Sequence, residues 1–268
     1  MLNKVVIDNI NIYTRGDVRN GALVFIHGNS LSAITFKKQF ELLPDYIPLV
    51  AFDLPGHGLS ARHDDYEDVY CIPGYIRSLQ TVIKSLQLDN FILVGHSLGG
   101  HIAIQASENI KGLKGLMVFG TPPIGMPPEM DQMFLPNPQM SLLFSNTINS
   151  EDALKLSAEF IHSNTELIAE LAEIITTTDG KARENLGVSI SKGQFSNEKE
   201  ILNNFKAPIA ILQGENERFV NALYLNNLDI PSLWKKNIIQ ITGAGHIPQM
   251  ENTKEINSAI SELYSHVF

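Results

Sequence analysis

The sequence predicts an α/β fold in which a mostly parallel central sheet carries helices on both faces and a helical cap is inserted between the late strands. Apolar runs of strand length alternate with helical patterns over the first 120 residues, as parallel strands joined by right-handed crossovers require. The alternation stops at residue 121 and resumes near residue 207. A chain of 268 residues with 44% hydrophobic content is long enough for one large domain with such an insertion.

The elements of the first part follow from their residue patterns. Two short apolar segments flank Asp8-Asn9 and predict a hairpin over residues 5–13. Further apolar runs predict buried strands at residues 22–26, 48–52, 91–94 and 115–119. Helical patterns predict helices at residues 32–43, 73–86 and 97–108.

Residues 121–206 contain no convincing strand and predict a helical cap. Turn-forming prolines open this segment, and helical patterns follow them: Pro122, Pro123, Pro127, Pro128, Pro136 and Pro138. A long excursion inside a compact domain is usually functional or disordered, and the apolar content here argues against disorder. The sheet then resumes with strands at residues 208–213 and 237–241 and a closing helix at residues 253–264. We therefore expect a core domain formed by residues 1–120 and 207–268, with residues 121–206 as its cap.

Composition disfavours several kinds of partner. The formal net charge of −9 argues against nucleic acid, which needs clustered Lys and Arg. The sequence shows neither an N-terminal targeting pattern nor an apolar run that could cross a bilayer, so we expect a soluble, cytoplasmic protein without a membrane partner. Cys71 is the single cysteine, which excludes an internal disulfide and a cysteine-built zinc site. No histidine spacing typical of metal hydrolases occurs, and we expect neither a metal nor a cofactor.

Ser97 is the first candidate catalytic residue. It stands in Gly95-His96-Ser97-Leu98-Gly99, directly after a predicted buried strand and directly before a predicted helix. A strand that turns sharply into a helix forces its corner residue into a strained conformation, and bulky neighbours two positions away would collide with it. Glycines at 95 and 99 fit this requirement, so the pattern predicts a nucleophile elbow with an exposed serine hydroxyl.

A serine hydroxyl needs an imidazole to remove its proton and a carboxylate to orient that imidazole. In this kind of fold the order along the chain is serine, acid, histidine. Glu217 follows the predicted strand at 208–213 and takes the acid position, with Glu215 as the competing carboxylate. His246 follows the last predicted strand and is the predicted base.

Acyl transfer also needs donors that face the oxygen that becomes negative. The backbone amide of Leu98 lies at a helix start without an intrahelical partner, and the amide of Asn29 follows the first buried strand, so both are predicted oxyanion-hole donors. His96 and His101 flank the elbow, where they either line the pocket or pack. His27 and His57 are interpreted as structural residues of loops.

The cap composition is compatible with an aliphatic ligand. Methionines and aromatic residues are frequent near its start, and flexible thioethers adapt to variable acyl chains, although the same residues could simply pack the cap onto the core. The candidate substrate-binding residues are His96, Met126, Met130, Met133, Phe134 and Phe219.

The chain resembles the α/β-hydrolase superfamily, and within it the AidH-type N-acyl-homoserine lactonases. The resemblance spans nearly the whole length and rests on His27-Gly28-Asn29-Ser30, Asp53-Leu54-Pro55-Gly56-His57-Gly58, Ser97-Leu98-Gly99-Gly100-His101-Ile102, Gly120-Thr121-Pro122-Pro123, Thr178-Asp179-Gly180-Lys181-Ala182-Arg183, Glu217-Arg218-Phe219-Val220 and Ala244-Gly245-His246. It implies metal-independent opening of the homoserine lactone ring, a quorum-quenching activity, by Ser97, Glu217 and His246.

Two other functions remain open at this point. A general carboxylesterase acting on small acyl esters would use the same three residues with a different pocket. A ligand receptor could keep this fold and these residues while its cap changes shape to recruit a partner. The predicted partner is in each case a small molecule, an ester or a lactone for the two enzymes.

Overall fold

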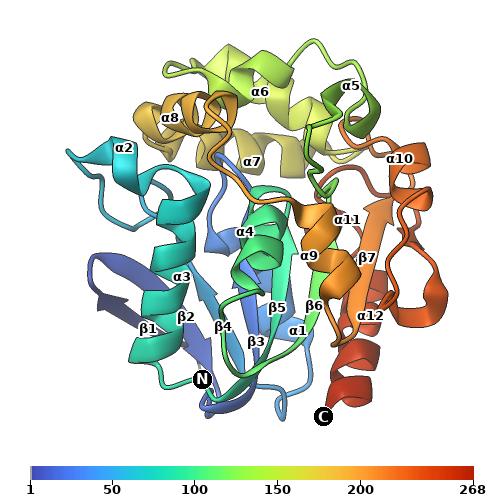
Figure 1. The fold of residues 1–268 in the computed structure, drawn as a ribbon. Helices are drawn as coiled ribbons and strands as arrows, with labels where there is room; N and C mark the ends of the chain where they lie inside the picture. The colour runs from blue at the N-terminus through green and yellow to red at the C-terminus, as the bar shows by residue number, and fades with distance from the viewer. Residues whose placement is uncertain (1) are drawn as a thin grey trace.

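The central sheet has eight strands in the order β1-β2-β4-β3-β5-β6-β7-β8 (Figure 1). The computed structural model describes residues 2–268. The strands are β1 (Leu2–Ile7), β2 (Ile10–Arg15), β3 (Asn20–Ile26), β4 (Leu49–Phe52), β5 (Asn90–His96), β6 (Leu113–Phe119), β7 (Ile209–Gly214) and β8 (Ile239–Ile241). β1 and β2 form an antiparallel hairpin and β2 pairs antiparallel with β4, whereas all pairs from β4 to β8 are parallel. The predicted mostly parallel sheet is confirmed.

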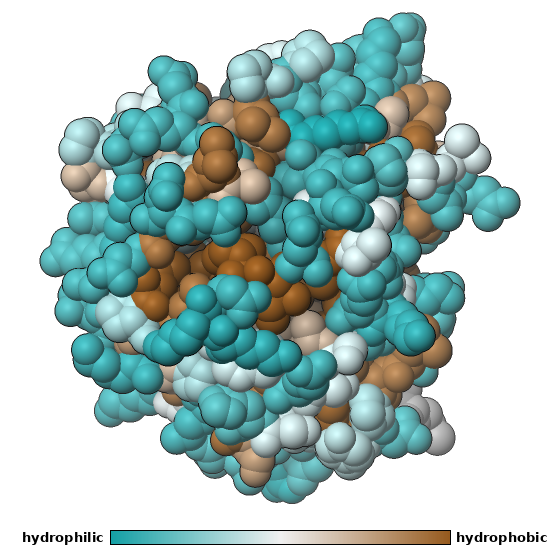
Figure 2. Space-filling view, turned by 90° about the vertical axis from the view of Figure 1, so that its right-hand side faces the viewer, coloured by the Kyte–Doolittle hydropathy of each residue, from teal (hydrophilic) through white to brown (hydrophobic). Residues whose placement is uncertain are grey.

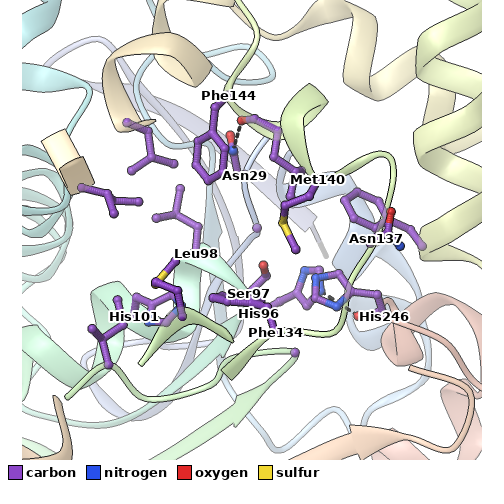
Figure 3. Close-up of a pocket in the computed structure, with 18 of the residues that line it drawn as sticks. Asn29, His96, Ser97, Leu98, His101, Phe134, Asn137, Met140, Phe144 and His246 are labelled. Carbon is purple, nitrogen blue, oxygen red and sulfur yellow. Dashed lines mark hydrogen bonds between the residues drawn. The ribbon is translucent and has the colours of Figure 1, made fainter. Parts of the chain in front are cut away.

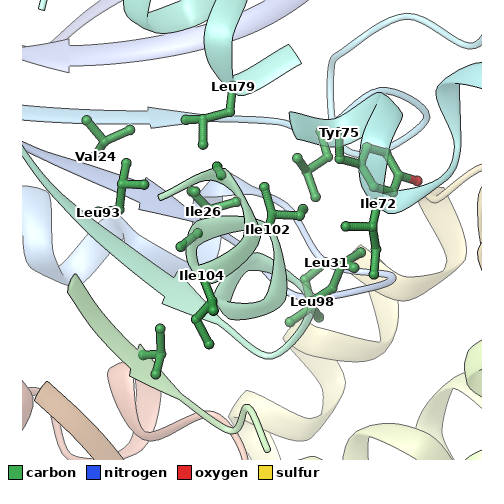
Figure 4. Packing of buried hydrophobic residues seen from close by; sticks show 14 of the residues in the cluster. Val24, Ile26, Leu31, Ile72, Tyr75, Leu79, Leu93, Leu98, Ile102 and Ile104 are labelled. Carbon is green, nitrogen blue, oxygen red and sulfur yellow. The ribbon is translucent and has the colours of Figure 1, made fainter. Parts of the chain in front are cut away.

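Helices cover both faces of the sheet because alternate strand residues point to opposite sides. On one face, Val24 and Ile26 join a core with α3 (Ile72–Ser85), α4 (Leu98–Ala106) and α9 (Glu198–Asn204), and Figure 4 shows part of this packing. On the other face, Leu23 and Phe25 pack with α1 (Lys37–Leu42) and α12 (Thr253–Val267) nearby. The predicted helices on both faces are therefore confirmed.

Two local differences from the prediction have simple causes. The segment predicted as one helix over 32–43 begins as a 3-10 turn, η1 (Ala33–Phe36), and only then becomes α1, which ends before Pro44. The Ser32 side chain does not cap this start. The short helix α2 (Tyr66–Val69) was not predicted, because four residues are too few to show a helical period.

Residues 121–206 hold helices and turns between β6 and β7, with no strand among the described residues. The helices are α5 (Met130–Met133), η2 (Met140–Phe144), α6 (Ser150–Phe160), α7 (Thr165–Thr177), α8 (Gly180–Ser191) and α9. Asn149, Asn164, Asp179 and Asn197 each accept a hydrogen bond from the first turn of the following helix, which explains where α6 to α9 begin. Helices α5 to α8 lie beyond the carboxyl ends of the strands, while α9 packs against α4 (Figure 1).

Buried polar side chains tie this segment together and to the core. Arg183 is 3% exposed and donates to the carbonyl oxygens of Ser145, Ile175, Thr178 and Asn146. Asn185 donates from the same helix to the carbonyl of Tyr70 at 3.1 Å, close to the start of α3. None of the helices within residues 2–268 is long and apolar enough to span a membrane.

Candidate active site

Ser97 lies at the sharp turn between β5 and α4. Its backbone has φ 50° and ψ −116°, a conformation that costs a residue with a side chain about 1–3 kcal/mol. The turn fits because Gly95 and Gly99 lack side chains: a Cβ on Gly95 would stand 2.4 Å from the oxygen of Gly99, and a Cβ on Gly99 would stand 2.1 Å from the oxygen of Ile26. Ser97 is partly exposed while its immediate neighbours are buried. The local fold thus presents one hydroxyl at the carboxyl edge of the sheet.

His246 and Glu217 come from the loops after β8 and β7 and form a buried pair. His246 Nδ1 lies 2.8 Å from Glu217 Oε2, and both side chains are at most 5% exposed. Glu217 Oε1 accepts hydrogen bonds from the amides of Phe219 at 2.7 Å and Val220 at 3.4 Å. Burial alone would raise the pKa of Glu217, but the charge and hydrogen bond of His246, together with these two amides, lower it below its usual range. The carboxyl group is therefore ionised at neutral pH.

The competing carboxylate, Glu215, points elsewhere. It is exposed, and its Oε2 accepts a hydrogen bond from the amide of Gly243 at 2.9 Å. The structure thus brings Glu217, and not Glu215, to His246. Ser97 and His246 line one cavity (Figure 3). Ser97 Oγ has no hydrogen-bond partner among residues 2–268, and contacts of this kind in unliganded hydrolases are often long until substrate binds.

His96 contacts the backbone of His246. Its ring is fully buried, stacks on Phe119 with ring centroids 5.3 Å apart, and lies within 2.9 Å of the carbonyl oxygen of His246 through Nε2. Burial and the nearby His246 hold the pKa of His96 well below its usual range, so the ring is neutral and Nε2–H donates to that carbonyl. His96 therefore positions the backbone of His246.

The two predicted oxyanion donors, Asn29 and Leu98, line the same cavity as Ser97. Neither backbone amide donates a hydrogen bond to any described residue. The side chain of Asn29, unlike its backbone amide, makes a hydrogen bond: its Nδ2 donates to the carbonyl of Leu143 in η2 at 2.6 Å. His27 connects two neighbouring loops, because its Nε2 accepts a hydrogen bond from the amide of Leu54 at 2.9 Å.

The cavity has a volume of about 590 Å³ and is lined mainly by apolar side chains of the core and of residues 121–206. Of the six predicted substrate-binding residues, His96, Met130 and Phe134 line it. The other three do not: Met126 is 48% exposed, Met133 is fully enclosed in the protein, and Phe219 packs against His246 with ring centroids 5.2 Å apart.

Several lining residues were not predicted. Leu186 and Ile190 stand four residues apart on α8, so the helical spacing of apolar residues could have identified them. Phe160 ends α6 and stacks on the ring of His246 at 5.1 Å, which no local pattern indicates. Figure 2 shows the face that carries α5 and α10 (Ala222–Asn226) in Figure 1, where hydrophobic residues gather in a hollow bordered by hydrophilic ones.

No group of three or more His, Cys, Asp or Glu side chains within residues 2–268 is arranged to hold a metal ion. The geometry of Ser97, His246 and Glu217 can instead support nucleophilic attack by an activated serine. The sequence also matches the profile of the Alpha/beta hydrolase family over residues 23–259. The chain belongs to this family.

Solved structures of an N-acyl-homoserine lactonase are similar to this hydrolase over nearly its full length. A mutant of the lactonase AidH complexed with N-hexanoyl homoserine lactone is 28% identical, with a TM-score of 0.89 over 98% of this chain and 96% of that one. Curated relatives match a shorter part. A serine hydrolase-like protein of Danio rerio is 34% identical over 113 residues, which is 41% of this chain and 33% of that protein.

A second curated relative has a different kind of activity in its name. The 2-succinyl-6-hydroxy-2,4-cyclohexadiene-1-carboxylate synthase of Escherichia coli O157:H7 is 38% identical over 104 residues, or 38% of each chain. The matched part thus spans between a third and two fifths of these two curated relatives. Similarity in sequence or fold does not by itself determine the substrate of a protein.

Proposed function

We propose that this hydrolase opens the lactone ring of N-acyl-homoserine lactones through an acyl-enzyme on Ser97. The observation that carries the proposal is the buried Glu217–His246 pair beside Ser97 in a mostly apolar cavity, in a chain that is 28% identical to the AidH lactonase over 98% of its length. An apolar cavity of about 590 Å³ under the helices of residues 121–206 suits a small molecule with an aliphatic chain.

Each residue has a defined role in this reaction. Ser97 Oγ attacks the lactone carbonyl carbon while His246 Nε2 takes the hydroxyl proton, and Glu217 holds the proton on Nδ1. The amides of Asn29 and Leu98 donate to the oxygen that becomes negative. His246 then gives its proton to the ring oxygen as the ring opens. Water, activated by the same imidazole, releases Ser97 and yields the open acid, which is the substrate plus one water.

Mass analysis of the product tests this reaction directly. One product heavier than N-hexanoyl homoserine lactone by one water is expected, and Ser97→Ala should produce none above background. Two fragments would instead mean cleavage of the amide bond, and absence of turnover would refute this substrate class. A protein that binds the lactone, does not hydrolyse any ester and recruits a partner would be a receptor.

General carboxylesterase activity is a second candidate, and the hydrogen bond that the Asn29 side chain makes within the protein favours it. Because its Nδ2 donates to Leu143, it is not free to hold a substrate amide in this structure. Discrimination lies in transition-state binding, so kcat/KM values separate the two candidates. A lactonase should have a higher kcat/KM for N-hexanoyl homoserine lactone than for p-nitrophenyl hexanoate, and an esterase the reverse.

A further inference from the structure

Three glutamates hold the histidine loop, residues 242–246, which follows β8 and ends in His246. Each accepts a hydrogen bond from one backbone amide of this loop at 2.7 to 2.9 Å: Glu255 from Thr242, Glu215 from Gly243, and Glu251 from Gly245. Glu251 differs from the other two because its partner directly precedes His246. Its second oxygen, Oε1, accepts from the amide of His162 at 2.6 Å, just after α6. The Glu251 carboxylate therefore joins the histidine loop to the inserted segment 121–206.

Glu251 is attached to the core of the protein. It is the last residue of α11 (Pro248–Glu251), a short helix in which Pro248 and Gln249 are buried. α11 packs against α1 and α12, which cover one face of the sheet. The side chain of Glu251 thus extends from a core helix to two other segments, the histidine loop and the end of α6.

The end of α6 makes contacts of its own with His246. The carbonyl oxygen of Phe160 accepts a hydrogen bond from the amide of His246 at 2.8 Å, and the Phe160 ring stacks on the imidazole at 5.1 Å. The two segments fit closely, since a Cβ on Gly245 would stand 2.6 Å from the oxygen of Phe160 and 3.2 Å from the nitrogen of His162. Glu251 accepts an amide on each side of this junction and holds the two segments together.

The carboxylate of Glu251 has no ion-pair partner. It forms no salt bridge with another residue within 2–268, and both of its oxygens accept from backbone amides. Burial raises the pKa of this carboxyl group above its usual value, although both amides lower it. The charged group is thus retained at a cost in stability, which is a frequent property of functional sites.

We propose that Glu251 is a positioning residue for the proposed base: its carboxylate holds the histidine loop against the end of α6 and thereby fixes the imidazole of His246 relative to Ser97. The inference rests on the proposed serine hydrolysis, in which His246 moves a proton in both half-reactions. It adds the end of α6 to the parts of the fold that set the geometry of the site. A displacement of about 1 Å in such a geometry can lower a rate by about 10²-fold.

Glu251→Gln tests the contact at nearly constant side-chain size. The amide oxygen accepts from one backbone amide, while the NH2 group faces the other one, donor against donor. We expect kcat for p-nitrophenyl hexanoate to fall by about tenfold, the effect of one charge-assisted hydrogen bond, with KM within about twofold of wild type. KM stays because acylation and deacylation both use His246 and slow alike. An unchanged kcat in the folded variant, or a change confined to KM, would overturn the proposal.

Glu255→Gln is the matched control. Glu255 also accepts one amide of the histidine loop, but Thr242 lies four residues before His246, and Glu255 makes no hydrogen bond with α6 among the described residues. This variant should keep kcat within about twofold of wild type, and an equal loss in both variants would overturn the specific role of Glu251. If Glu251→Gln does not fold, Glu251→Asp replaces it. Aspartate keeps the charge but is one methylene too short to reach both amides, so the same loss of kcat is expected and an unchanged kcat would refute the contact.

Proton NMR reports on His246 without turnover. The Nδ1 proton that points to the buried Glu217 Oε2 at 2.8 Å should give a strongly deshielded signal, which Glu217→Gln identifies by its loss. In Glu251→Gln this signal should shift or broaden, whereas in Glu255→Gln it should not. An unshifted signal in Glu251→Gln would overturn the proposal. If the wild type hydrolyses no ester, the proposed function fails, and this signal still decides whether Glu251 holds His246 in place.

Discussion

Replacing Glu217 with glutamine changes the proton on His246 as well as the charge beside it. Glu217 Oε1 accepts hydrogen bonds from the amides of Phe219 and Val220, so in Glu217→Gln this position has to be the amide oxygen. The amide NH2 group then occupies the place of Oε2, 2.8 Å from His246 Nδ1. It can only donate there, which moves the imidazole proton to Nε2, where the ring cannot act as a base toward Ser97.

The expected loss of kcat follows from the lost negative charge of Glu217. The developing imidazolium and the carboxylate have charge centres about 4 Å apart, and at an effective dielectric constant of about 20 their attraction is about 4 kcal/mol. At about 1.4 kcal/mol per factor of ten, its loss lowers kcat by about 10³-fold. The stability of the variant should be checked by thermal unfolding, so that loss of fold is not counted as loss of catalysis.

The assay is kcat for p-nitrophenyl hexanoate, measured for Glu217→Gln and for Glu215→Gln as the matched control. Glu215 is exposed and holds only the amide of Gly243, so its variant should stay within about twofold of wild type. A folded Glu217→Gln protein with full activity would refute the role of Glu217. A large loss in Glu215→Gln alone would assign the acid to the other carboxylate.

Three further predictions address backbone strain at Ser97, the pH dependence of stability, and the buried Arg183. Ser97→Gly should abolish turnover yet raise Tm by about 2–4 °C, because about 1 kcal/mol of strain at φ 50° is released; a lower Tm would contradict the strain. Burial lowers the pKa of His27 from 6.5 to about 4, so between these pH values the unfolded chain binds a proton that the folded protein does not. The free energy of unfolding should therefore fall by about 3 kcal/mol as the pH is lowered from 6.5 to 4. Denaturant titrations should show a smaller loss in His27→Gln, and an equal loss would contradict this assignment. Arg183→Met should lower the free energy of unfolding by about 3 kcal/mol or more, because it removes the donor to four carbonyl oxygens within residues 121–206. Arg183→Lys should not restore the loss, and full stability of either variant would argue against this cluster.

The sheet could be predicted because its inner strands are covered on both faces. β3 to β7 are apolar over nearly their whole length, which marks them as runs in the sequence. The elbow at Ser97 could be predicted because the glycines that it requires lie within two residues of the serine. Glu217 and His246 follow strand ends, and the fixed order of strands brings those ends to one edge.

The roles of residues 121–206 could not be assigned in the same way. Met126 and Met133 lie seven residues apart in a turn-rich segment that has no helical period, so nothing in the sequence tells which methionine faces the cavity. The pairing of His101 with Glu198 joins residues 97 positions apart, and it depends on the path by which the chain returns from α8 to α4. Such contacts are set by tertiary packing, which local patterns do not encode.

The hydrogen bond between Asn29 Nδ2 and the carbonyl of Leu143 ties the loop after β3 to η2. Any outward displacement of η2 has to break it, at about 1 kcal/mol, and releases an amide side chain directly beside the backbone donor proposed for the oxyanion. Because Leu143 lines the cavity, this contact joins the cavity wall to the residue that carries the proposed donor. Because the acceptor belongs to the main chain, substitutions at 143 leave this contact in place, whereas a substitution at 29 removes it.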